Sequence, residues 1–71
     1  MSYIVTRLER EGERTVSVSS TVVPYFELWR AQNKAEQLAR AHRSFGFDQE
    51  SACWEGSDDD GPTFRYAAVQ A

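Results

Sequence analysis

His42 is the only histidine of the sequence and the first residue to consider for acid–base chemistry. A histidine acts as a general acid or base when it lies in a cleft beside a nucleophile or a carboxylate. Its spacing from Leu38 and Phe45 instead places His42 on the apolar stripe of a predicted helix, as a histidine at the edge of the core. No pair of residues has the spacing of a nucleophile and its base, so we expect that the protein is not an enzyme.

The residues that could bind a metal are few. Cys53 is the only cysteine, so it forms no internal disulfide, and with His42 it makes at most half of a structural zinc site. The run Asp58-Asp59-Asp60-Gly61 has the start of a calcium loop, but the glutamate that an EF-hand requires beyond its glycine is missing. Aspartate and glycine are also ordinary residues of an exposed turn. We therefore expect no metal and no cofactor.

The acidic residues are unevenly distributed along the chain. Residues 1–46 carry seven basic and five acidic side chains, whereas residues 47–71 carry one basic and six acidic side chains. An acidic end repels nucleic acid and attracts a basic protein partner, although charge runs also serve solubility alone. The candidate acidic partner-binding residues are Asp48, Glu50, Glu55, Asp58, Asp59 and Asp60.

A second candidate partner-binding surface consists of Tyr25, Phe26, Trp29 and Arg30. On a helical wheel the three aromatic residues fall outside the apolar arc, so we expect them to be partly exposed. Trp, Tyr and Arg are the residue types that dominate binding hot spots. The alternative is that the first hairpin folds over this end of the helix, or that the segment is a strand.

The elements that position these residues begin with a β-hairpin over residues 3–22. Two runs of alternating pattern flank Gly12, which can adopt the positive φ of a tight turn without steric cost. In the second run, Val16, Val18 and Val22 fall mostly on one face and hydroxyl side chains on the other.

A single helix is expected over residues 24–45, with Pro24 at its first position and Gly46 as its C-terminal cap. An alternative extends a strand through residue 30 and begins the helix at an Asn33 cap. The predicted core-facing stripe is narrow and made mostly of small residues: Leu28, Ala31, Ala35, Leu38, Ala39, His42 and Phe45.

A second hairpin is expected over residues 51–69, where two short strand-like runs flank an acidic turn. Trp54, Phe64 and Tyr66 would supply most of its apolar area and compensate for the alanine-rich helix. The order of elements predicts an α+β fold, a four-stranded antiparallel sheet with one helix packed on one face. The chain of 71 residues is long enough for one domain, spanning residues 1–71.

Composition limits the environment of the protein. No apolar stretch approaches the roughly 20 residues of a membrane span, and the first residues lack a basic start leading into an apolar block. The net charge is -3, and 27% of the residues are charged. We therefore expect a cytoplasmic protein that does not bind membranes.

In its size, its acidity and its element order, the chain resembles small phage anti-CRISPR proteins. The resemblance rests on the opening strand Ser2-Tyr3-Ile4-Val5, the turn Arg10-Glu11-Gly12-Glu13, one helix and a second hairpin. It implies a protein of the bacterial cytoplasm that inhibits a CRISPR-Cas effector, with acidic residues set against the effector's nucleic-acid-binding arginines and lysines. The sequence thus predicts a protein-binding module that occupies a basic surface.

Two other functions are compatible with the sequence. One is direct nucleic-acid binding through the basic residues of the helix, Arg30, Lys34, Arg40 and Arg43, although the sequence pI of about 5.0 opposes it. The other is a homodimeric structural domain.

Overall fold

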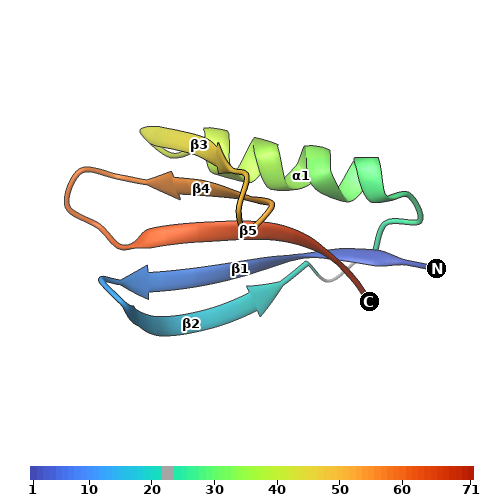
Figure 1. Ribbon diagram of the computed structural model, residues 1–71, viewed down its shortest axis with the longest axis horizontal. Helices are drawn as coiled ribbons and strands as arrows, with labels where there is room; N and C mark the ends of the chain where they lie inside the picture. The colour runs from blue at the N-terminus through green and yellow to red at the C-terminus, as the bar shows by residue number, and fades with distance from the viewer. Residues whose placement is uncertain (22–23) are drawn as a thin grey trace.

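The computed structural model describes residues 1–21 and 24–71 and shows one helix packed on a five-stranded antiparallel sheet (Figure 1). The α+β class and the single helix on an antiparallel sheet are confirmed. The expected number of four strands is wrong, because the described residues form five. In chain order the elements are β1 (Tyr3–Glu11), β2 (Arg14–Ser20), α1 (Leu28–Arg40), β3 (Ser44–Asp48), β4 (Cys53–Ser57) and β5 (Thr63–Gln70).

The strand order in the sheet is β2-β1-β5-β4-β3, so β2 and β3 are the edge strands. The first and last strands pair in the middle, from Tyr3 opposite Gln70 to Arg10 opposite Thr63. This pairing sets both chain termini at one end of the molecule, and the β1–β2 turn and the β4–β5 loop at the other (Figure 1).

The first hairpin is formed as predicted, and Gly12 at its turn has a φ of 62°. Its second strand ends at Ser20, and Val22, which we expected in that strand, lies outside the described residues. Every residue of β2 is exposed. A register shift between Glu9 and Arg10 marks a bulge in its pairing with β1.

The helix begins at Leu28 rather than at Pro24. The reason is a pair of backbone hydrogen bonds of 2.7 Å each, in which Tyr3 and Tyr25 exchange their N–H and C=O groups. This bridge holds the chain before the helix against β1 in an extended conformation. The alternative of a helix that begins at Asn33 is also wrong.

The helix ends at Arg40, so the expectation that it continues to Phe45 with Gly46 as its cap is wrong. The backbone N–H of Arg43 donates to the Asp58 carboxylate at 3.0 Å rather than to a carbonyl of the helix. The chain then becomes extended as β3, which pairs with β4 from Ser44↔Ser57 to Asp48↔Cys53. Just after the end of the helix, Arg43 thus binds Asp58, a residue 15 positions later in the chain.

The core lies between α1 and the middle of the sheet. Ala31, Ala35 and Ala39 are at most 1% exposed, and they face the buried side chains of Val5 and Tyr66. Alanine lets the helix lie close to the sheet, and larger residues around it complete the packing, as we expected for the alanine stripe. The partly buried residues that pack against this core are Tyr3, Tyr25, Leu38, Trp54, Phe64 and Ala68.

The core is small, and much apolar surface remains outside it. The accessible area is 5019 Å², compared with about 4,500 Å² for a typical compact monomer of this mass. Among residues 1–21 and 24–71, nine large hydrophobic residues are at least 38% exposed. Among the described residues, no helix has the length and apolar character needed to cross a membrane.

Candidate functional site

His42 lies between Asp58 and Tyr66. Its Nε2 is 2.6 Å from the Tyr66 hydroxyl oxygen, and its Nδ1 is 3.2 Å from a carboxylate oxygen of Asp58. The ring also stacks on Phe64, with 4.8 Å between the ring centroids. A Cβ at position 56 would collide with the His42 ring, so Gly56 leaves the space that the imidazole fills.

Asp58, His42 and Tyr66 are residue types that can relay a proton. Their environment, however, indicates a structural role. Tyr66 is only 4% exposed. Burial raises the pKa of Tyr66 above its ordinary value of 10.0, so its hydroxyl ionises less readily than that of a free tyrosine. A catalytic hydroxyl needs access to a substrate and easy loss of its proton. We infer that His42 joins the end of α1 to β5 and to the β4–β5 loop.

Stability should fall in acid because of Asp58. Hydrogen bonds from the Arg43 backbone N–H and from His42 hold the pKa of Asp58 below its ordinary value of 3.8. The unfolded chain therefore binds the proton more readily, and the stability contributed by the carboxylate is present above pH 3.8 and lost as the pH falls through the lowered folded value. Urea unfolding at a series of acidic pH values measures this loss.

The control is Asp58→Asn, which retains an oxygen that can accept from the Arg43 N–H but does not titrate. We expect the free energy of unfolding of the variant to decrease less between about pH 5 and about pH 2 than that of the parent. Parallel curves would show that Asp58 does not contribute.

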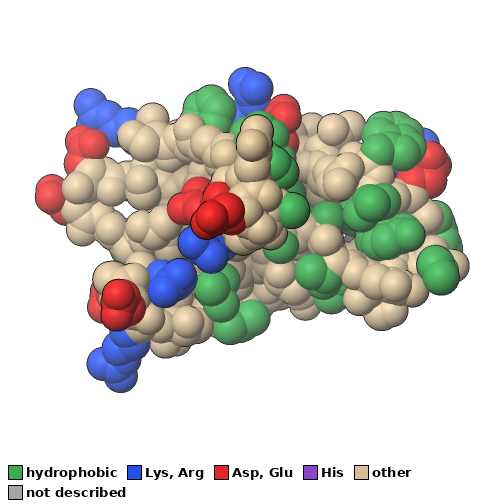
Figure 2. Space-filling view, viewed as in Figure 1, with side chains coloured by type: hydrophobic (Ala, Val, Ile, Leu, Met, Phe, Trp, Pro, Cys, Tyr) green, Lys and Arg blue, Asp and Glu red, His purple; other side chains and the backbone are tan. Residues whose placement is uncertain are grey.

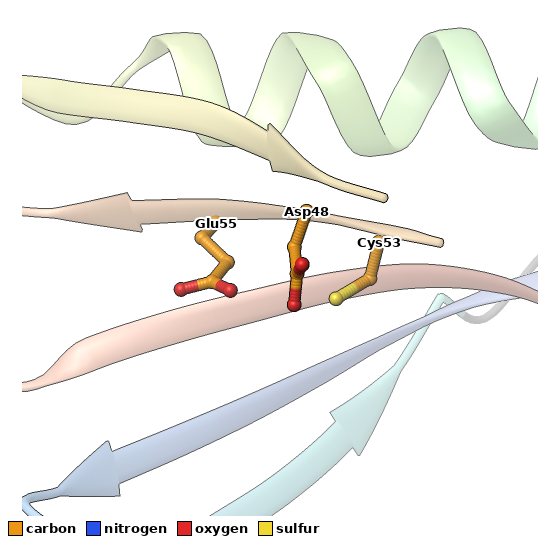
Figure 3. A group of neighbouring side chains, drawn as sticks. All are labelled: Asp48, Cys53 and Glu55. Atoms are coloured by element: carbon orange, nitrogen blue, oxygen red, sulfur yellow. The ribbon is translucent and has the colours of Figure 1, made fainter. Parts of the chain in front are cut away.

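A second cluster lies on the sheet face opposite α1 and consists of Asp48, Cys53 and Glu55 (Figure 3). One potential ligand atom of each residue lies within 4.8 Å of the others. Arg65 approaches both carboxylates, at 4.0 Å from Asp48 and 3.5 Å from Glu55.

This cluster has the chemistry of an ion-pair group. The Arg65 guanidinium already supplies positive charge to both carboxylates, and a dedicated metal would have to compete with it. Ser51 donates to Asp48 at 2.6 Å, and this hydrogen bond holds the pKa of Asp48 below its ordinary value. Cys53 is 4% exposed, and its sulfur lies 2.9 Å from the Ser51 oxygen, so a reagent in solvent has little access to the thiol.

The six acidic candidates do not form one surface. Asp48 and Glu55 belong to the cluster beside Arg65 described above. Glu50 lies nearby in the exposed β3–β4 turn. Asp58, Asp59 and Asp60 lie beyond the other end of β4, in the β4–β5 loop (Figure 1). The structure thus divides a group that is continuous by charge in the sequence.

The loop also has a basic neighbour that the sequence analysis missed. Arg43 Nη1 is 2.7 Å from an oxygen of Asp59, and the backbone of Arg43 binds Asp58. Asp60 and Glu11, the last residue of β1, both line a hollow of about 270 Å³, and Arg10 lines the same hollow. Two acidic residues that are far apart in the sequence therefore border one hollow at this end of the molecule, together with a basic residue.

Two of the three aromatic candidates are exposed, and the third is not. Phe26 is 82% exposed and Trp29 is 52% exposed, as predicted. Tyr25 does not belong with them, because it bridges Tyr3 and packs against the core. Arg30 lies over the Trp29 ring, at 5.0 Å from its centroid.

Two neighbours enlarge this apolar region. Leu28 is 42% exposed and Met1 is 89% exposed, and both lie toward the end of the molecule where α1 begins. Figure 2 shows hydrophobic side chains gathered at this end, whereas charged side chains dominate the end with the β1–β2 turn. We call Phe26, Leu28 and Trp29 the helix-start patch.

The basic residues of the helix are largely paired with acids. Arg30 is 3.3 Å from Glu27, and Arg40 is 3.2 Å from Glu36. Arg43, beyond the end of the helix, pairs with Asp59. This pairing weakens the case for a phosphate-binding stripe along α1.

No family model, no curated protein and no solved structure matches this chain. A proposal on its function therefore rests on the surfaces described above. Phe45 and Phe47 lie on β3 and are 46% and 50% exposed. The expectation that Phe45 belongs to the core-facing stripe of the helix is therefore wrong, and Phe47 was not expected to be an exposed residue of a strand. The alternation Phe-Gly-Phe was the signal that could have identified them as residues of an edge strand.

Proposed function

We propose that this protein is a small protein-binding module that acts by covering a surface of a larger partner with its helix-start patch. The observation that carries the proposal is the exposure of Phe26 and Trp29, two large aromatic side chains three residues apart at one end of the molecule. Exposed clusters of this kind mark interaction sites, and buried tryptophan and arginine anchors contribute most of the binding energy in such interfaces.

The arrangement of Trp29 supports a recognition role. The indole N–H donates to the Glu27 carboxylate, and Arg30 pairs with Glu27 and lies over the indole ring. These contacts restrict a side chain that would otherwise be free in solvent. A side chain already held in one conformation loses less entropy on binding.

The binding test compares the parent with Phe26→Ser and Trp29→Ala. The parent is immobilised, proteins retained from a bacterial lysate are identified, and each is purified and titrated against the parent and the variants. We expect each variant to bind at least tenfold more weakly, about 1.4 kcal/mol, because both side chains contact the partner.

Val18→Ser is the matched control, since Val18 is 65% exposed but lies on β2 away from the start of α1. Its affinity should equal that of the parent. Unchanged affinity for both patch variants, with folded circular dichroism spectra, would exclude the helix-start patch as the binding surface.

A more specific candidate function is inhibition of a nucleic-acid-handling complex, such as a bacterial CRISPR-Cas effector, by occupation of its basic surface. The observation that favours it is the hollow lined by Asp60 of the β4–β5 loop and by Glu11 of β1, beside Arg10, which sets acids from two segments at one end of the molecule. Acidic groups there would compete with nucleic acid for arginines and lysines and would speed association at low salt.

The same titration tests this candidate with Asp59→Asn combined with Asp60→Asn. Asp58 is left intact, because it accepts the Arg43 N–H and its loss would disturb the fold. If the acidic end is the contact, the double variant binds at least tenfold more weakly at low salt, and the parent displaces DNA from the purified partner. Parental affinity in the variant would exclude the acidic end.

A further inference from the structure

We propose that β3 pairs with β3 of a second copy of this chain, in an antiparallel arrangement with Gly46 on the two-fold axis. The pairing would join two five-stranded sheets into one continuous sheet. This inference does not rest on the proposed function, because the helix-start patch and the acidic loop lie away from the centre of β3.

The edge strand β3 has the features of a strand that accepts a neighbour. All five of its residues pair with β4 in one unshifted register, from Ser44↔Ser57 to Asp48↔Cys53, and its outer edge faces no strand among the described residues. Regular, unprotected edges are templates for pairing with another chain.

The aromatic residues of β3 expose apolar surface that a second strand could bury. Phe45 and Phe47 are 46% and 50% exposed, and both lie on the side of the sheet that carries α1. The Arg40 guanidinium carbon lies over the Phe45 ring, 5.1 Å from its centroid. The Phe47 and Trp54 rings pack edge to face, with 5.4 Å between their centroids. Each ring thus packs on one side against a side chain of its own chain and is exposed on the other side.

The sequence of β3 is complementary to itself in one register. When two copies pair antiparallel about Gly46, Phe45 of each copy lies directly opposite Phe47 of the other, and Ser44 lies opposite Asp48. Directly opposed aromatic residues interact favourably, and a serine hydroxyl can donate to the opposed carboxylate. Gly46 lies on the axis, and a Cβ at this position would meet no atom of its own chain within 4 Å.

Other antiparallel registers lose this match. Pairing about Phe47 would set Phe45 opposite Gln49 and Asp48 opposite Gly46. A shift by one residue would set Phe45 opposite Gly46, and it would place the two helices on opposite faces of the joined sheet. Only pairing about Gly46 opposes both phenylalanines of each copy to phenylalanines.

The other edge strand is a weaker candidate. β2 is rich in serine, and the bulge between Glu9 and Arg10 disturbs its pairing with β1. Bulges at edges twist the strand away from further pairing. Val16 and Val18 offer less area than two phenylalanines.

A cysteine cross-link tests the register directly. The variant Gly46→Cys, in a Cys53→Ser background, places one thiol of each copy on the two-fold axis. Residues directly opposed in an antiparallel pair have Cα atoms about 4.5 to 5.5 Å apart, within the range that a disulfide spans. We expect mild oxidation to give a covalent dimer on a non-reducing gel, while Val18→Cys in the same background stays monomeric.

A charge-pair exchange tests the opposition of Phe45 and Phe47. Phe47→Lys alone should lose dimerisation in light scattering, because a lysine would face Phe45 of the other copy. Phe45→Glu combined with Phe47→Lys should regain it, since each glutamate would face a lysine across the axis. Circular dichroism melting confirms that each variant is folded.

A parent that stays monomeric at the highest attainable concentration would overturn the proposal. A dimer that cross-links through Val18→Cys and not through Gly46→Cys would do the same, because it would assign the interface to β2. Covalent dimer through Gly46→Cys together with rescue by the double variant would establish both the edge and the register.

Discussion

Tyr66→Ala is expected to lower the free energy of unfolding by about 3 to 5 kcal/mol, a large share of the total for a domain of this size. Tyr66 is 4% exposed in the middle of β5, where it lies opposite Trp54 on β4 and Arg7 on β1. Removing its ring leaves a cavity beneath the alanines of α1, which are too small to fill it. Urea denaturation followed by circular dichroism measures the loss.

The matched control is Tyr66→Phe, which retains the ring and removes only the hydroxyl. It should cost about 1 kcal/mol, because the hydrogen bond to His42 Nε2 is lost. The difference between the two variants separates the contribution of packing from that of the His42 contact. Equal losses for both variants would contradict the placement of the ring in the core.

Trp54→Ala is expected to cost about 3 kcal/mol, since the indole packs partly buried against the core and against the Phe47 ring. The chain contains a second tryptophan as a control. Trp29 is 52% exposed, and Trp29→Ala should change stability by only about 0.5 kcal/mol.

Chemical denaturation of both tryptophan variants tests the contrast, and the remaining tryptophan reports unfolding by fluorescence in each. A loss at Trp29 as large as that at Trp54 would mean that the start of α1 is covered by the rest of the chain. It would also argue against the helix-start patch as a free binding surface.

Several features of this protein were determined by local sequence. The first hairpin follows from strand alternation on both sides of Gly12, whose positive φ the turn requires. Helical periodicity correctly predicted that Ala31, Ala35 and Ala39 are buried, but it also placed Leu28 on the buried face, and this was wrong because Leu28 is 42% exposed. Phe26 and Trp29 were predicted to be exposed by the same periodicity.

The candidate surfaces were less predictable, because exposure depends on what lies next to a residue in space. Tyr25 was expected beside Phe26 and Trp29, but its backbone bonds to Tyr3 draw it toward the core. The acidic residues were expected to act together, yet strand β4 separates Asp48 from the Asp58–Asp60 loop. Arg43 reaches that loop only because the chain turns after α1.

The fifth strand was decided by tertiary structure alone. Phe45 continues the helical spacing of Leu38 and His42, so the sequence up to Gly46 is compatible with one long helix. In the folded chain, Asp58 binds the Arg43 N–H and β4 pairs with residues 44–48. The backbone groups that a longer helix would have paired internally are paired with a strand that comes later in the chain. The alternation Phe45-Gly46-Phe47 is compatible with that strand, but by itself it does not decide between strand and helix.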